Sequence, residues 1–147
     1  MPHRTFVAIN FDAATKRGIE EGLARFKASL PQEIRSGFRF LPKEQWHLTV
    51  LFLGNQDDDE VSRIASVLRG VAKVAPPPEI EFGRICLGPP GRPPRMIWLL
   101  ARDEASRDLG RVKETLEEAL EEEGIRFERE GRKFHGHVTL ARRAVPL

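Results

Sequence analysis

The chain has 147 residues, of which 40% are hydrophobic and 31% charged, and its formal net charge is +2. This composition excludes a wholly disordered chain, and no apolar run approaches the roughly 20 residues of a membrane-spanning helix. The single cysteine, Cys86, excludes an internal disulfide and a cysteine-rich zinc site. We expect one cytoplasmic domain over residues 1–147, with no secretory signal at its start.

The first third of the chain alternates between strand and helix patterns. Residues 5–11 are a predicted strand, because the positions 6–9 are all apolar and no helix or strand breaker interrupts them. Asp12 is a predicted N-cap for a helix that reaches about residue 30, where Pro31 ends it. Two strands are expected next, a short one at 38–41 and a longer one at 46–54 that ends in a Gly-Asn turn signal.

The rest of the chain continues in the same way. The acidic run 57–60 favours a helix start, because negative charge stabilises the positive end of the helix dipole. Prolines at 76–78 end that helix, and Gly124 is a predicted C-terminal cap for a later one. The remaining predictions are a strand at 79–87, a loop at 88–94, a strand at 95–101, a helix at 104–123, a strand at 125–130 and a final strand around 134–142.

The second half of the chain repeats the first at an offset of 90 residues. The offset pairs Val7 with Ile97 and the helical position Ile19 with Leu109. An internal repeat of this size predicts two similar lobes. We therefore expect an α+β fold that is bilobal and pseudo-symmetric. Its sheets are mainly antiparallel, its helices lie on the outer faces, and a central cleft separates the lobes.

The same offset pairs two His-x-Thr motifs, His47-Leu-Thr49 and His137-Val-Thr139. Alternate residues of a strand point to the same face, so each His shares a face with its Thr. The apolar residues of each strand are then expected on a buried opposite face. These are Trp46, Leu48, Val50 and Phe52 in the first strand, and Phe134, Val138 and Leu140 in the second.

Two facing histidines suit concerted general acid–base catalysis, because an imidazole pKa near about 6.5 allows one ring to be neutral and the other protonated. Neighbouring threonine hydroxyls can donate hydrogen bonds to the oxygens of an anion between the rings. A phosphodiester fits this arrangement. No carboxylate cluster typical of a magnesium site accompanies the motifs, and we expect no metal and no cofactor.

These residues resemble the 2H phosphoesterases, and in particular their RNA 2′,3′-cyclic phosphodiesterase (2′-5′ RNA ligase) family. The resemblance rests on the segments Arg4–Ile9, Trp46–Gly54, Pro94–Trp98 and Phe134–Arg142. The family usually has Pro directly before the second His, where this chain has Gly136.

The resemblance implies metal-free opening of an RNA 2′,3′-cyclic phosphate to a 2′-phosphate, possible in reverse as 2′-5′ ligation. It implies that His47 protonates the leaving 3′-oxygen, that His137 activates water, and that Thr49 and Thr139 hold the phosphate. Arg142 matches the family's arginine and is a candidate substrate contact, although strict alternation turns it away from the face of Thr139. The implied partner is RNA with a cyclic phosphate end, tRNA fragments included. No membrane partner is expected, and monomer is the default state.

Three other interpretations remain open on the sequence. His135, His137 and His47 could form an open zinc site. The basic residues around the second motif could belong to a non-catalytic RNA-binding module, although most Phe and Trp residues fall at core positions and no stacking platform is evident. A third interpretation is a 2H phosphoesterase that acts on small cyclic phosphates.

Overall fold

The computed structural model describes residues 2–90 and 93–144. These residues form two compact units, each assembled from three separate stretches of chain. Unit 1 comprises Met1–Ala8, Thr49–Glu81 and Arg102–Gly136, and unit 2 comprises Ile9–Leu48, Phe82–Ala101 and His137–Leu147. Each unit is described by itself.

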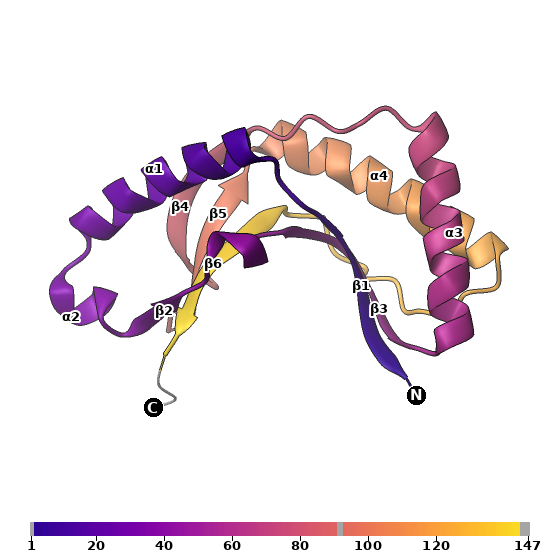
Figure 1. The fold of residues 1–147 in the computed structure, drawn as a ribbon, viewed down its shortest axis with the longest axis horizontal. Coiled ribbons are helices and arrows are strands. Elements are labelled where there is room, and N and C mark those ends of the chain that lie inside the picture. Colours follow the sequence, from indigo (N-terminus) through magenta and orange to yellow (C-terminus); the bar gives the residue numbers. More distant parts are fainter. Residues whose placement is uncertain (1, 91–92, 145–147) are drawn as a thin grey trace. The chain divides into compact units, whose positions relative to one another are not determined.

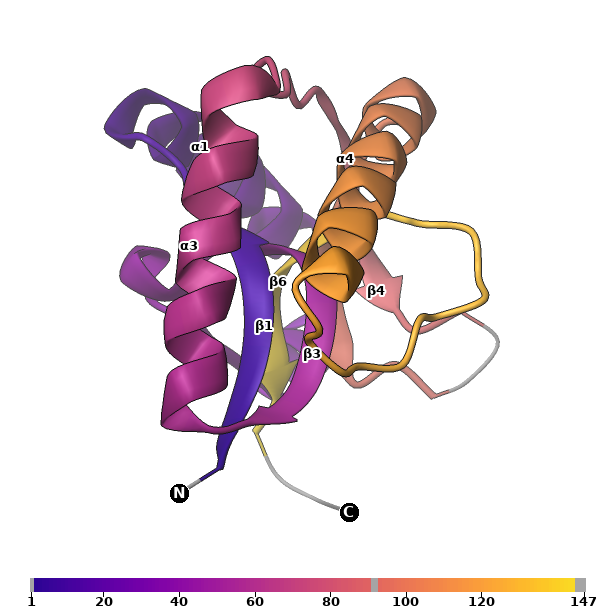
Figure 2. The same ribbon diagram turned by 90° about the vertical axis from the view of Figure 1, so that its right-hand side faces the viewer.

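Unit 1 packs two long helices beside two neighbouring strands. The strands are β1 (His3–Ile9) and β3 (Leu48–Gln56), and the helices are α3 (Asp58–Val74) and α4 (Asp103–Glu122). Figure 2 shows α3 and α4 side by side against the β1–β3 pair. The acidic run starts α3 as predicted, because Asp57 and Glu60 form a reciprocal capping box. Gly124 ends α4 with a positive φ of 79°, which a residue with a side chain adopts only under strain.

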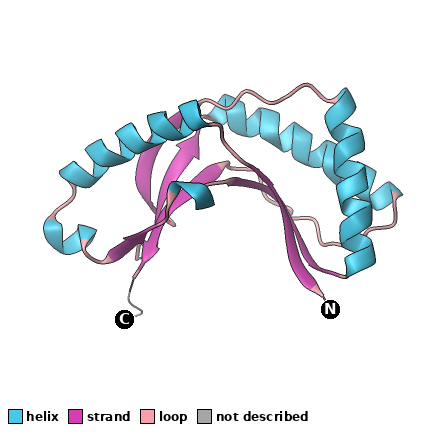
Figure 3. Cartoon of the chain, in the orientation of Figure 1, coloured by secondary structure: helices cyan, strands magenta, loops and turns pink. Residues whose placement is uncertain are grey.

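The strand predicted at 125–130 is wrong. This stretch runs from α4 toward β6 without strand structure (Figure 3). A pocket of about 500 Å³ lies between residues 52–54 of β3 and residues 126–128, so the two backbones do not form a ladder. Other contacts hold the stretch instead: Gln56 donates to the Arg126 carbonyl at 2.8 Å, and Arg129 binds Glu121 of α4.

The burial predicted for Phe52 is also wrong. Phe52 is 56% exposed and lies 6.3 Å, centroid to centroid, from the exposed ring of Phe6. Leu51 and Leu53, on the other side of the strand, are each only 2% exposed. Leu48 and Val50 are buried on one side of β3, and Leu51 and Leu53 are buried on the other. The strand is therefore covered on both sides near its start, but the side of Leu48 is exposed again at Phe52.

Unit 2 is an antiparallel sheet in the order β2-β6-β5-β4. Its strands are β2 (Phe38–Phe40), β4 (Phe82–Gly88), β5 (Met96–Ala101) and β6 (His137–Arg143). Every pairing in it is antiparallel. Helix α1 (Ala13–Ser29) contacts β4 and crosses in front of β4 and β5 in Figure 1. It is followed by the short α2 (Gln32–Arg35) and a 3₁₀ turn, η1 (Lys43–Gln45). Neither α2 nor η1 was predicted from the sequence.

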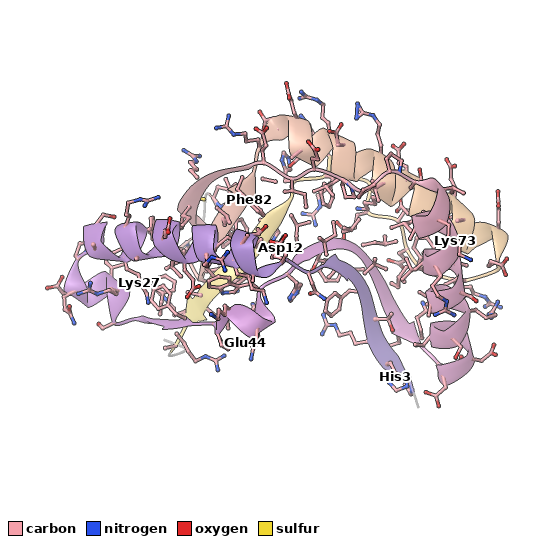
Figure 4. All side chains as sticks on the ribbon, turned by 45° about the horizontal axis from the view of Figure 1, so that its top comes forward. His3, Asp12, Lys27, Glu44, Lys73 and Phe82 are labelled. Atoms are coloured by element: carbon pink, nitrogen blue, oxygen red, sulfur yellow. The ribbon has the colours of Figure 1, made fainter. Side chains whose placement is uncertain are left out.

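Helix α1 begins and packs as its sequence predicts. Asp12, labelled at the start of the helix in Figure 4, accepts a hydrogen bond from the Thr15 backbone N–H at 2.8 Å. Hydrogen bonding from the Thr15 side chain, together with that from its backbone N–H, lowers the pKa of the Asp12 carboxyl below its ordinary value of 3.8. Ile19 and Leu23 are buried on the inner face. Phe82, also labelled in Figure 4, packs edge-on against Phe11 at 5.6 Å.

Each unit contains elements from both sequence repeats. Helix α1 belongs to the first repeat but lies in unit 2 with β5 and β6 of the second repeat, whereas α4 of the second repeat lies in unit 1 with β3. The α+β class with antiparallel pairing is confirmed, and a cleft between the lobes stays a prediction. Among residues 2–90 and 93–144, no helix is long and apolar enough to cross a bilayer.

Candidate functional site

Strand β6 presents a polar face and a buried face within unit 2. Val138 and Leu140 are completely buried, whereas His137 and Thr139 between them are half-buried. Trp98 of β5 pairs directly with Thr139, and Leu99 pairs with Val138. Directly opposite residues share a face of the sheet. Trp98, Thr139 and His137 therefore lie on one face, as the alternation in the sequence predicted for the last two.

The first motif reaches this face through one backbone pairing. Leu48, the first residue of β3, pairs antiparallel with Val138, and both side chains are completely buried. Continuing this register by one residue places His47 opposite Thr139 and diagonal to His137. Diagonal neighbours of an antiparallel pair are about 7–8 Å apart. His47, His137 and Thr139 all belong to unit 2, and their meeting in one site stays a prediction. Thr49 begins the second stretch of unit 1, and its place beside them stays a prediction.

The backbone before β3 orients the first imidazole. Nδ1 of His47 lies 2.8 Å from the carbonyl oxygen of Gln45, the last residue of η1. A carbonyl oxygen only accepts, so Nδ1 carries the proton and, in the neutral ring, the lone pair is on Nε2. The 3₁₀ turn therefore fixes both the tautomer and the ring orientation of His47.

Trp98 is a site residue that the sequence analysis missed. Its indole stacks on the His137 imidazole with ring centroids 4.4 Å apart and planes 31° apart. The six-membered ring of the indole also lies against Gly88 of β4, where an added Cβ would stand 2.5 Å from Cε3 of Trp98. The glycine therefore allows the indole to lie flat between β4 and the imidazole. The sequence showed Trp98 within an apolar strand, which is equally typical of a core residue.

The structure corrects the orientation predicted for Arg142. The β5–β6 register shifts by one residue between the pairs Trp98–Thr139 and Ile97–Ala141, which leaves Leu140 as the extra residue of a β-bulge. Beyond the bulge Arg142 pairs with Met96, two residues before Trp98 on the same face of β5. The bulge therefore turns Arg142 toward the face of Thr139. Its Nη1 lies 3.6 Å from Sδ of Met96.

A second arginine shares this face. Arg39 of β2 pairs directly with Arg142, and both are exposed. On the opposite face of β2, Phe38 is 8% exposed, and Nζ of Lys27 from α1 lies 4.1 Å above the Phe40 ring. The Phe-Arg-Phe alternation in the sequence could have identified Arg39 as outward-facing, but not its partner.

Gly136, which stands where the 2H family usually has Pro, has a specific role in unit 1. Its backbone N–H donates to the Oγ of buried Ser106 on α4 at 3.0 Å. Proline has no N–H and cannot form this bond. The same part of unit 1 holds Lys113, which is 7% exposed and lies 5.7 Å from the Phe134 ring centroid. These contacts tie the segment before the second motif to α4.

The zinc interpretation finds no support in the part of the chain that the structure describes. Within it, no group of three or more His, Cys, Asp or Glu residues could hold a metal ion.

Comparison with known proteins shows a consistent set of relatives. A family model described as "LigT like Phosphoesterase" matches residues 14–98. The chain is 29% identical over 127 residues to the RNA 2′,3′-cyclic phosphodiesterase of Bacillus subtilis, a match that covers 85% of this chain and 67% of that protein. The chain thus spans about two thirds of the length of that relative.

Solved structures share the fold. A Thermus thermophilus protein, TT0787, superposes with a TM-score of 0.68 at 26% identity, over 99% of this chain and 76% of its own. The structure of E. coli LigT complexed with 3′-AMP gives a TM-score of 0.67 at 21% identity, over 99% of this chain and 75% of its own.

Proposed function

The chain belongs to the LigT-like phosphoesterase family, and we propose that it hydrolyses the 2′,3′-cyclic phosphate at an RNA end to a 2′-phosphate. The name of the Bacillus subtilis relative and the 3′-AMP bound to E. coli LigT support a nucleotide phosphate as substrate. The observation that carries the proposal is the pairing of Leu48 with Val138, which supports the two motif histidines as a facing pair.

The chemistry follows from two imidazoles on opposite sides of one phosphorus. His137 removes a proton from water as its oxygen forms a bond to phosphorus, and the bond from phosphorus to the 3′-oxygen breaks. His47 gives its proton to that oxygen. Hydroxyl groups of Thr139 and Thr49 donate to the non-bridging oxygens, where negative charge increases in the transition state. With a 5′-hydroxyl in place of water, the same step forms a 2′-5′ bond.

The hydrogen bond to Gln45 identifies the reacting nitrogen of His47. With Nδ1–H bound to the Gln45 carbonyl, the second proton of the imidazolium is on Nε2, so Nε2 is the atom that gives a proton to the leaving oxygen. After the step the ring is the neutral Nδ1–H tautomer, which the same hydrogen bond stabilises.

Product analysis tests the proposal. Wild type, His47→Ala and His137→Ala would be incubated in EDTA with a short RNA that ends in a 2′,3′-cyclic phosphate. Each variant should lose at least about 10²–10⁴-fold in rate, the usual contribution of a general acid or base, and the wild-type product should carry a 2′-phosphate. A 3′-phosphate product, or a variant as active as wild type, would refute the two-histidine mechanism.

A further inference from the structure

The β2–β6 pairing places two positive charges directly opposite one another. Arg39 and Arg142 form a cross-strand pair, and like charges in this position are unfavourable for folding. Neither guanidinium forms an ion pair with a carboxylate among residues 2–90 and 93–144. No carboxylate of the described part of unit 2 therefore neutralises a positive pair that the fold itself sets up.

The pair lies on the same face as the candidate phosphate-binding residue. Arg142 is opposite Met96, Thr139 is opposite Trp98, and two residues separate Met96 from Trp98 along β5. A strand rises by about 3.4 Å per residue, so the arginine pair is about 7 Å along the sheet from Thr139. This step is comparable with the spacing of successive phosphates in a nucleic acid strand.

The geometry of the guanidinium group suits this ligand. Arginine presents a planar fork of donors that binds two phosphate oxygens at once. Two forks from neighbouring strands can hold one phosphodiester between them, and the bound anion removes their mutual repulsion. A cyclic mononucleotide has no second phosphate to place there.

We propose that Arg39 and Arg142 form a binding site for the RNA phosphodiester next to the reacting cyclic phosphate. The site makes oligonucleotide ends better substrates than small cyclic mononucleotides. This inference rests on the proposed function for its substrate, and it decides between the RNA and small-molecule interpretations that the sequence left open.

A comparison of two substrates tests the site. We would measure kcat/KM for a cyclic mononucleotide, 2′,3′-cyclic AMP, and for a tetranucleotide that ends in a 2′,3′-cyclic phosphate. Wild type should prefer the tetranucleotide, and Arg39→Gln and Arg142→Gln should each reduce that preference about tenfold, the usual effect of losing a charge-assisted hydrogen bond. Arg107→Gln, which removes an exposed charge from α4, is the matched control and should leave the preference unchanged.

A direct measurement of oligonucleotide affinity, and of its dependence on salt, tests the arginine pair without relying on catalytic turnover. The affinity for a fluorescent tetranucleotide with a 2′-phosphate end, measured by anisotropy, should fall less steeply with salt in Arg39→Gln, by about 0.7 in the log–log slope. If wild type turns over neither substrate, the proposed function fails while the binding measurement still tests the arginine pair. Equal tetranucleotide affinity and equal salt slope in wild type, Arg39→Gln and Arg142→Gln would overturn the inference.

Discussion

Replacing Gly88 by alanine should damage both folding and catalysis through Trp98. The new Cβ would stand 2.5 Å from Cε3 of the indole and 2.8 Å from both Cδ2 and Cζ3, well inside normal carbon–carbon contact at about 3.5–4.0 Å. Overpacking of this kind costs about 1–3 kcal/mol. In a domain of this size, each kcal/mol lowers Tm by about 2–4 °C.

The direction in which the Trp98 indole is displaced links the loss of stability to a loss of activity. Gly88 is on β4 and His137 is on β6, with Trp98 on β5 between them. An indole displaced away from β4 therefore moves toward the imidazole that already stacks on it at 4.4 Å. We expect a loss of kcat with the loss of stability, because His137 is the proposed general base and a misplaced base transfers protons poorly.

A double-mutant cycle separates this mechanism from a general effect of the methyl group. In a Trp98→Leu background the clashing ring is absent, so Gly88→Ala should cost less than about 0.5 kcal/mol in urea unfolding. Gly18→Ala on α1, where an added Cβ meets nothing within 4 Å, is the control and should be stabilising. A Gly88→Ala variant as stable as wild type, or equally destabilised in both backgrounds, would refute the reasoning.

Four further substitutions test other parts of the fold by unfolding experiments. Leu51→Ala should cost about 2–5 kcal/mol and Phe52→Ser less than about 1 kcal/mol, since only Leu51 is buried; the reverse order would contradict the side assigned to β3. Gly136→Pro should destabilise by about 1 kcal/mol, because Ser106 loses its donor, and a stabilised variant would argue against that bond. Asp12→Ala should destabilise near neutral pH. Because folding lowers the pKa of Asp12, the ionised carboxylate stabilises the fold at any pH above its ordinary pKa of 3.8, and this stability is lost as the pH falls through the folded-state pKa. The destabilisation by Asp12→Ala should therefore shrink in acid. A destabilisation that stays constant with pH would contradict this reasoning.

The helices were predictable because their signals are local. Each of α1, α3 and α4 has an apolar period that marks one face, and Asp12, Asp57 and Gly124 lie at helix ends where their chemistry satisfies the backbone. The strand at 125–130 failed for the opposite reason. A strand exists only with a hydrogen-bonding neighbour. The sequence of residues 125–130 does not show whether β3 lies close enough to pair with them.

In the candidate site, too, local signals were predictable from the sequence and a change of register was not. The His-x-Thr pairs could be found in the sequence because the His and Thr of each pair are only two residues apart and the repeat doubles the motif. Arg142 was assigned to the wrong face because a single extra residue, Leu140, reverses the alternation. No residue type near Leu140 marks that bulge, since Leu140 and Ala141 are both simply buried apolar residues.

The bulge also explains why one strand can serve both packing and binding. Before it, β6 buries Val138 against Leu48 and Leu99 and turns His137 and Thr139 to the polar face. After it, the strand still buries Ala141, opposite Ile97, but the next residue now meets Arg39 and Met96. Without the extra residue, Arg142 would point into the α1 side of the sheet, where burial of a guanidinium is costly. The residue that breaks the alternation is thus what places the arginine on the same face of the sheet as His137 and Thr139.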